Sequence, residues 1–395
     1  MSAFDEISVA LERLRARDLY RRRRVVDSAL SREVRVGDRQ VLNFCSNDYL
    51  GLANEPRIAA AFKEGVDRWG TGAGASHLVC GHTAAHHELE EALAEFTGRE
   101  RALLFSSGYS ANVGTVNALV GQRDAVFEDR LNHASLLDGG WISRAEFRWY
   151  EHANVNDLER QLESLDEDRR RRLVVTDGTF SMDGDLCPVA ELADAARRHD
   201  AWLMIDDAHG IGVCGEGGRG VVDPARFGTS EVPVLMATLG KAFGTFGAFV
   251  AGDEVLIEYL VQRARNYIYT TALPSAVAVA TLASLRIATA EEWRREKLRE
   301  LIGRFRDGAK QLDIDVLPSA TPIQPVVIGD SAAALAASAA LEARGILVTA
   351  IRPPTVPQGT ARLRITLTAA HEHADVDRLL DALAASQNEP DRAAG

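Results

Sequence analysis

Lys241 is the side chain in this sequence with the clearest chemical potential. Lysine and arginine together number 45, but only four are lysines, and the other three, Lys63, Lys297 and Lys310, lie in charged or amphipathic stretches. Lys241 lies instead among the small and apolar residues of 239–243. Such surroundings favour the neutral, nucleophilic form of an amine, whereas arginine stays protonated. We therefore expect Lys241 to form a Schiff base with a carbonyl compound.

Other polar groups follow apolar stretches in the same way, namely Ser106–Tyr109, His133 and Asp206. Taken singly, each has an ordinary explanation: a helix cap, a structural histidine and a carboxylate that caps a turn. Together with His209 and Lys241 they offer an anion cradle, a ring-stacking imidazole, a partner for a pyridinium N–H and an amine. This is the set of groups that a pyridoxal 5'-phosphate (PLP) enzyme requires.

The chain around these residues alternates short apolar strands with helices. The predicted strands are 102–105, 125–127, 173–176, 202–205 and 234–237, and the predicted helices are 86–97, 109–120, 155–166 and 188–199. This alternation predicts an α/β fold with a mostly parallel sheet that is covered on both faces. Ligands of such sheets bind beyond the carboxyl ends of the strands. The anion cradle, the two histidines, Asp206 and Lys241 would meet there.

The length of 395 residues favours two domains. We expect a large cofactor-binding domain over 46–286 and a smaller α+β domain from 1–45 and 287–395. In the smaller domain we predict a helix over 1–24, a hairpin over 33–45 turning at Gly37–Asp38, helices over 287–311 and 331–344, and strands at 323–328, 348–351 and 362–366.

Composition excludes several classes of function. The net charge of −12 argues against general nucleic-acid binding. No apolar stretch is long enough to span a membrane, and the charged N-terminus lacks a signal-peptide core, so we expect a cytoplasmic protein. The cysteines are widely spaced and form no C-x-x-C pair, so neither a disulfide framework nor a metal site is expected: Cys45, Cys80, Cys187 and Cys214.

Several segments together carry a family resemblance: 46–52, 129–136, 176–185, 206–210 and 239–241. In these segments the chain resembles the α-oxoamine synthases, a family of fold-type I PLP enzymes, over nearly its whole length. The stretches 349–357 and 359–364 resemble the members that condense L-alanine with a pimeloyl thioester in biotin synthesis. Two departures concern Asp177, where some members have glutamate, and 70–82, where much of the family has Gly-Gly-Ser-Arg.

The resemblance implies roles for the cofactor site. Lys241 would hold PLP and move the Cα proton, Asp206 would pair with the pyridine nitrogen, and His133 would stack on the ring. His209 would hydrogen-bond the ring's phenolic oxygen. The remaining contacts implied are Ser181 beside the ring, Gly108, Tyr109 and Thr238 at the phosphate, and Thr270 and Thr271 at the phosphate of a neighbouring subunit. The enzyme would therefore be a homodimer with shared active sites.

The resemblance also implies substrate contacts. Arg364 would take the amino-acid carboxylate, and His133 would face the substrate as well as the cofactor. The residues placed near the acyl group are Arg21, Asn47, Arg352 and Thr355. Coenzyme A or an acyl carrier protein would deliver that group. The residues alone, without the resemblance, favour two surface arginines on an edge strand for Arg362 and Arg364.

Three other functions were weighed. Another α-oxoamine synthase, such as glycine C-acetyltransferase, would share the same site. A non-catalytic scaffold subunit would be expected to lose the lysine, which this chain keeps together with Asp206, His133 and His209. A nucleotide-binding oxidoreductase is disfavoured, because the glycine-rich segment 70–74 does not follow a strand.

Overall fold

The computed structural model describes residues 4–166 and 168–387. The chain divides into two compact units, a smaller one of Met1–Gly51, Met182–Gly184 and Glu296–Gly395, and a larger one of Leu52–Ser181 and Asp185–Arg295. This division differs from the boundaries expected from the sequence in assigning 46–51 and Met182–Gly184 to the smaller unit and 287–295 to the larger unit.

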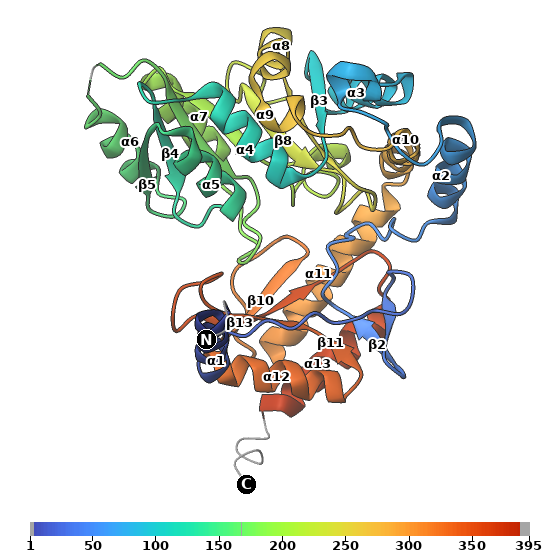
Figure 1. Ribbon diagram of the computed structural model, residues 1–395. Coiled ribbons are helices and arrows are strands. Elements are labelled where there is room, and N and C mark those ends of the chain that lie inside the picture. The colour runs from blue at the N-terminus through green and yellow to red at the C-terminus, as the bar shows by residue number, and fades with distance from the viewer. Residues whose placement is uncertain (1–3, 167, 388–395) are drawn as a thin grey trace. The chain divides into compact units, whose positions relative to one another are not determined.

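The larger unit is built on a seven-stranded sheet (Figure 1). Its strands, in spatial order, are β3 (Arg101–Phe105), β9 (Ala248–Gly252), β8 (Val234–Thr238), β7 (Trp202–Asp206), β6 (Arg172–Asp177), β4 (Ala125–Asp129) and β5 (Glu146–Tyr150). β9 is antiparallel to both neighbours, and all other neighbouring pairs are parallel. The predicted mostly parallel α/β sheet is confirmed. β5 and β9 were not predicted; β5 is a mostly half-exposed strand with a mixed polar sequence.

Alternate residues of the central strands enter two separate apolar cores, one on each face of the sheet. Val175 and Met204 belong to one core, whereas Val174 and Leu203 belong to the other. The first core includes residues of α4 (Gly108–Leu119), α5 (Ala134–Ser143), α8 (Glu254–Arg263) and α9 (Arg265–Ile268), and the second includes residues of α6 (Val155–Glu163) and α7 (Val189–Arg198). The period-two pattern therefore buries both faces, as the continuous apolar strands indicated.

The rest of the larger unit is mainly helical. It contains α2 (Pro56–Trp69), a π-helical turn η1 (His77–Gly81), α3 (Ala84–Thr97), a 3-10 turn η2 (Glu216–Gly218) and α10 (Ser275–Ala290). α11 (Trp293–Gln311) begins in the larger unit and continues in the smaller one. The predicted single helix over 287–311 is wrong at its start, because 287–290 form the end of α10 and a new helix begins at Trp293.

The smaller unit holds two three-stranded sheets. One orders β1 (Glu33–Val36), β2 (Arg39–Asn43) and β11 (Ile346–Leu347), and the other orders β10 (Ile323–Gly329), β13 (Ala361–Thr366) and β12 (Thr349–Ile351). The helices are α1 (Asp5–Ala16), α12 (Ser331–Ala343) and α13 (His373–Gln387), with most of α11. The predicted hairpin is confirmed: Val36 pairs with Arg39, and Gly37 adopts the positive φ of 58° that this two-residue turn requires.

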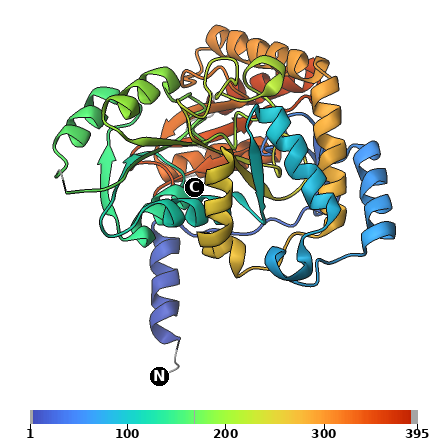
Figure 2. The same ribbon diagram turned by 90° about the horizontal axis from the view of Figure 1, so that it is seen from above.

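The N-terminal helix is shorter than predicted. α1 ends at Ala16, and the arginine-rich segment that follows is not helical. Asp18 has a φ of 56°, and Leu19 N donates to Leu14 O at 2.9 Å, which is the pattern of a left-handed helix cap. Figure 2 shows α1 extending away from the rest of its unit, and none of its residues is buried. Repulsion along 21–24, four consecutive arginines, opposes any continuation of the helix.

Across residues 4–166 and 168–387, no helix combines the length and the apolar character needed to cross a membrane.

Candidate active site

Lys241 lies in the loop between β8 and β9, with a half-buried side chain. Its Nζ is 2.7 Å from Nε2 of His209, which lies three residues beyond the end of β7. Gly244 N donates to Lys241 O at 2.8 Å and closes the turn. Gly244 has a φ of 63°, and a Cβ there would lie 2.4 Å from Ala53 N, so the turn requires glycine. The sheet thus brings together a lysine and a histidine that lie 32 residues apart.

Asp206 ends β7 and is 3% exposed. Its Oδ1 accepts a hydrogen bond from Ala208 N at 2.9 Å, and its Oδ2 accepts one from Asn112 Nδ2 at 2.7 Å. Both oxygens are therefore held in place, yet each keeps capacity to accept a further hydrogen bond. Asn112 was not selected from the sequence. The available signal was a polar side chain on a helix, α4, whose other residues are mostly apolar or small.

A directed chain of hydrogen bonds runs from Asn112 to His133, the N-cap of α5. Asn112 Nδ2 donates to Ser135 Oγ at 2.8 Å, which leaves the Ser135 hydroxyl proton for His133 Nδ1 at 2.7 Å. Ser135 N also donates to His133 Nδ1, at 3.3 Å. Because Nδ1 accepts, the proton of the neutral imidazole lies on Nε2. Burial lowers the pKa of His133 against the opposing charge of Asp206, which favours this neutral form.

Asp177 supports the same histidine from the end of β6. It is the register partner of Asp206 on β7, and its Oδ2 accepts a hydrogen bond from His133 N at 2.6 Å. Burial raises the pKa of Asp177 well above its usual range, and the charge of Asp206 raises it further. The sequence analysis noted this residue only as a departure from glutamate. The structure places it where it fixes the backbone of His133.

His152, which the sequence analysis did not select, braces the same edge of the sheet. Its Nδ1 is 3.1 Å from Asp129 Oδ1 and its Nε2 is 2.8 Å from Asp185 Oδ2. Burial alone lowers the pKa of His152, but these two carboxylates outweigh burial and raise it to about 10. The charged imidazolium therefore ties the end of β4 to the segment after β6.

The predicted anion cradle lies where α4 begins. Ser107 is the N-cap, and its Oγ accepts a hydrogen bond from Ser110 N at 3.2 Å. Gly108 and Tyr109 occupy the first turn, where backbone N–H groups have no partner within the helix and attract anions. Tyr109 turns its hydroxyl to Asp138 Oδ2 on α5, at 2.6 Å.

The other predicted cofactor residues lie at a strand end or on loops of the same unit. Thr238 ends β8, and its hydroxyl donates to Gly247 O at 3.0 Å. Ser181 is half-buried after β6. Thr270 and Thr271 lie between α9 and α10, half-buried and exposed respectively. Their roles toward the cofactor and toward a second subunit stay predictions.

Arg364 and Asn47, both predicted to contact substrate, meet in the smaller unit. Arg364 lies on β13, the middle strand of its sheet, and is 7% exposed. Its Nη1 donates to Asn47 Oδ1 at 3.1 Å and to Thr366 Oγ1 at 3.0 Å. Arg362 is also buried and pairs with Asp183. The alternative of two surface arginines on an edge strand is therefore wrong.

The remaining predicted acyl contacts lie on less regular segments. A cavity of about 440 Å³ in the smaller unit is lined by Arg352 together with Arg15, Asp18, Tyr20, Arg22, Arg24, Leu335, Ser338, Val348, Thr349 and Ala350. Arg21 and Thr355 are exposed and are not among these lining residues. The structure thus groups Arg352 with Arg22 and Arg24 rather than with Arg21.

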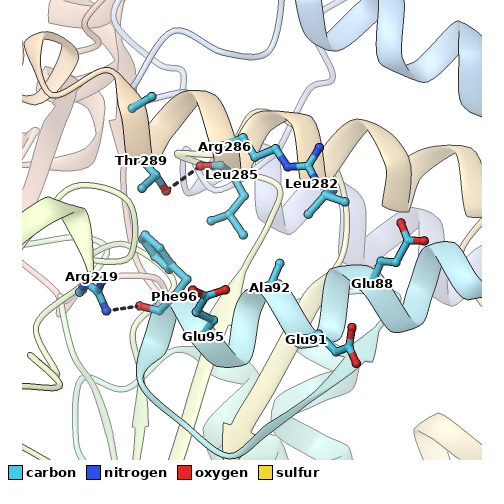
Figure 3. A pocket seen from close by; sticks show the side chains of 11 residues that line it. Glu88, Glu91, Ala92, Glu95, Phe96, Arg219, Leu282, Leu285, Arg286 and Thr289 are labelled. Atoms are coloured by element: carbon cyan, nitrogen blue, oxygen red, sulfur yellow. Dashed lines mark hydrogen bonds between the residues drawn. The ribbon is translucent and has the colours of Figure 1, made fainter.

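A second cavity, of about 630 Å³, lies between α3 and α10 of the larger unit (Figure 3). Glutamates of α3 line one side, and Arg286 and two leucines of α10 line the other. The lining includes no lysine, no histidine and none of the predicted site residues. The amine chemistry therefore does not belong to this cavity.

Comparison with known proteins agrees with this site. Residues 39–383 match the family model described as aminotransferase class I and II. The chain belongs to the class I and II aminotransferase family. Within that family it is 61% identical to the 8-amino-7-oxononanoate synthase of Nitrosococcus oceani, over 94% of this chain and 98% of the relative. It is also 61% identical to the synthase of the same name from Methylococcus capsulatus, over 96% and 98% respectively.

A solved structure gives the same family placement. The serine palmitoyltransferase of S. paucimobilis, solved with PLP and myriocin bound, matches with a TM-score of 0.91 and 29% identity, over 98% of this chain and 97% of that one. The fold-type I architecture expected from the sequence is therefore confirmed. The resemblance to the α-oxoamine synthases, which was first drawn from the motifs, is confirmed by the named relatives.

Proposed function

We propose that this class I and II aminotransferase family member is a PLP-dependent acyltransferase. It condenses L-alanine with a pimeloyl thioester and yields 8-amino-7-oxononanoate, CO2 and the free thiol, a step of biotin synthesis. The observation that carries the proposal is the identity of 61%, over nearly the full length, to a relative named 8-amino-7-oxononanoate synthase. The geometry agrees with it, because Lys241 Nζ lies 2.7 Å from His209 Nε2, and His209 closely follows Asp206 at the end of β7.

The residues present fit PLP. Asp206 is a buried carboxylate with capacity to accept a pyridinium N–H, and the start of α4 offers N–H groups to a phosphate. Lys241 would attach the cofactor, His133 would stack on the ring, Ser181 would lie beside the ring, and His209 would hydrogen-bond its phenolic oxygen. Gly108, Tyr109 and Thr238 would hold the phosphate. Bound PLP supplies an electron sink that stabilises negative charge on the Cα of an attached amino acid.

The chain's own groups handle the protons. Lys241 in its neutral form is the base for the Cα proton, and His209 keeps the amine oriented through their 2.7 Å contact. His133 presents an Nε2–H because its Nδ1 accepts from Ser135. That N–H would donate a hydrogen bond to the carbonyl oxygen of the β-keto acid as CO2 leaves, while the proton stays on Nε2. Asn112 and Asp177 hold Asp206 and His133 in place.

Substrate selection and assembly complete the proposal. Arg364 takes the alanine carboxylate by the bidentate geometry that suits guanidinium. Arg21, Asn47, Arg352 and Thr355 face the acyl thioester, carried by coenzyme A or by an acyl carrier protein. The enzyme is a cytoplasmic homodimer in which Thr270 and Thr271 reach the partner subunit's phosphate site.

A thiol-release assay tests this function directly. The holoenzyme is offered alanine, glycine or serine, each with acetyl, succinyl, pimeloyl or palmitoyl thioesters. We expect release of thiol and formation of 8-amino-7-oxononanoate with alanine and the pimeloyl thioester, and far slower release with every other pair. A preference for glycine with the acetyl thioester would contradict the proposal and favour glycine C-acetyltransferase.

A further inference from the structure

Four histidines gather around the start of α3, and none of them has a role in the proposed reaction: His77, His82, His86 and His87. Both ring nitrogens of His86 are occupied. Its Nδ1 accepts from Thr83 N at 3.0 Å, so its Nε2 carries the proton and donates to Leu273 O at 2.7 Å. His86 therefore serves the fold, as the capping partner of Thr83.

His82 differs because one of its nitrogens remains available. Its Nδ1 is 3.0 Å from Nδ1 of His77, so one of the two carries a proton that the other accepts. His77 is buried and stacked on Tyr267, with ring centroids 4.8 Å apart. When His82 donates to His77, the Nε2 of His82 keeps a free lone pair.

Glu90 on α3 places a carboxylate near that lone pair, and only one of its two oxygens accepts a hydrogen bond. Its Oε1 accepts from Leu104 N at 3.0 Å. Its Oε2 has no hydrogen bond among the described residues and lies 3.9 Å from His82 Nε2, beyond hydrogen-bond distance. Glu90 is only 9% exposed. A carboxylate oxygen that accepts no hydrogen bond from the protein can take a metal ion as its partner.

His87 supplies a third ligand on the same helix face. It precedes Glu90 by three residues, so both side chains project to one side of α3. The ligand atoms of His82, His87 and Glu90 all lie within 4.8 Å of one another. The His87 side chain is 60% exposed, and its Nε2 lies 3.3 Å from Oε1 of Glu91, which is itself exposed. Such an exposed side chain can change rotamer at little cost. The three groups come from the turn before α3 and from its first two turns.

We propose that His82, His87 and Glu90 bind a divalent transition-metal ion, Zn²⁺ by its ligand chemistry. Two imidazoles and one carboxylate are a ligand set that suits Zn²⁺, with a fourth position for water. Ligand atoms on one tetrahedral ion are separated by roughly 3.3 Å. The set must therefore contract from its present spread, which the exposed His87 allows. His77 accepts the N–H of His82 and thereby fixes the orientation of the His82 ring toward the ion.

Cysteine spacing, from which no metal site was expected, does not reveal this site, whereas the His-x-x-Glu pattern of α3 does. The site would not touch the proposed cofactor residues, so its role is to fasten the turn before α3 to the helix. Binding of an ion to the folded state alone stabilises that state by mass action.

The test uses the full chain loaded with PLP, freed of metal with a chelator and then of the chelator. Zn²⁺ is titrated by calorimetry, and Co²⁺ is used as an optical probe of ligand geometry. The variants are His87→Ala, at an exposed position, and Glu90→Gln, which keeps an oxygen for Leu104 N. The matched control is His373→Ala, because His373 also lies near one glutamate, at 3.8 Å from Glu300, without a third ligand. Cys80→Ser controls for the exposed thiol nearby.

We expect one Zn²⁺ per chain, a visible Co²⁺ spectrum typical of tetrahedral coordination, and a rise in melting temperature on binding. Each ligand variant should weaken binding by roughly tenfold or more, while His373→Ala and Cys80→Ser should leave it unchanged. The proposal is overturned if the parent chain binds no Zn²⁺ at micromolar concentrations, if His87→Ala binds as tightly as the parent, or if only Cys80→Ser abolishes binding. Because binding is measured without turnover, failure here leaves the proposed reaction untouched.

Discussion

The cofactor residues of the larger unit and the substrate residues of the smaller unit are built in different ways. Asp206 follows a buried strand directly, and Asn112, Ser135 and Asp177 hold it and His133 through short, buried hydrogen bonds. In the smaller unit only Arg364 is held comparably, through Asn47 and Thr366, whereas Arg21 and Thr355 are exposed. The contrast indicates that the sheet and its hydrogen bonds hold the predicted cofactor residues, whereas two of the predicted acyl contacts lie on exposed segments.

Of the changes considered, Asp206→Asn in the larger unit should lower activity most. Asparagine keeps the shape but removes the charge that retains the pyridinium proton, so we expect kcat to fall about 10²- to 10⁴-fold while cofactor still binds. Steady-state thiol release and cofactor absorbance would measure both. Asp124→Asn is the matched control, because Asp124 also accepts a backbone N–H, from Gly121 at 2.9 Å. An unchanged kcat would refute the electron-sink role of Asp206.

Substitutions of Arg364 and Arg352 distinguish the predicted contact with the amino acid from the predicted contact with the acyl thioester. Arg364→Ala should raise the KM for alanine roughly 10- to 100-fold, since a buried hydrogen-bonded charge is lost. Arg352→Ala should raise the KM for the thioester by less than about fivefold, as expected of a partly exposed charge. Arg364→Lys should rescue little, because lysine lacks the planar fork. The comparison would fail if Arg352→Ala proved the more damaging change.

Ser135→Ala tests the tautomer of His133. Without the hydroxyl, Nδ1 can take a proton, so the pKa of His133 should rise toward its ordinary value. We expect kcat to fall about tenfold and the acidic limb of the kcat–pH profile to move to higher pH. Ser143→Ala is the control on the same helix, because its hydroxyl donates to Gly140 O at 2.6 Å and accepts from Ala145 N at 3.1 Å, neither of which belongs to the site. A lower kcat with an unmoved profile would indicate a packing effect instead.

His152→Gln should affect stability more than catalysis. The folded-state pKa of about 10 exceeds the value of about 6.5 in an unfolded chain. The stabilisation is therefore complete below pH 6.5 and is lost as the pH rises through about 10. The variant should lower the free energy of unfolding by about 2 kcal/mol near pH 6, and the difference should shrink toward pH 10 in denaturant titrations. A pH-independent difference would contradict the charged state of His152.

The sequence predicted those site residues that a local pattern reveals. Lys241, Asp206 and His209 each follow an apolar stretch, and the turn at Gly37 has a recognisable two-residue signature. Asn112 could not be found in this way, because its contact with Asp206 spans 94 residues and depends on where α4 packs on the sheet. The same holds for Asp177, whose bond to His133 depends on strand order.

Irregular segments set a second limit. The helix predicted over 1–24 ends at Ala16. Helix propensity predicted the helix itself but not its end, which depends on the left-handed conformation of Asp18. Beyond that cap no periodicity fixes the direction of each side chain. Arg21 was therefore predicted as an acyl contact, whereas Arg22 and Arg24 line the cavity with Arg352.

The central claim, that Lys241 carries the cofactor, has one direct test. The holoenzyme is reduced with borohydride, digested and analysed by mass spectrometry, which locates the pyridoxyl group on its lysine. With only four lysines in the chain, the assignment is unambiguous. We predict that the label is found on Lys241 alone. The Lys241→Ala variant should lose both the label and all activity, whereas the Lys310→Ala variant should keep both. A label on Lys63, Lys297 or Lys310, or turnover retained by Lys241→Ala, would contradict the account.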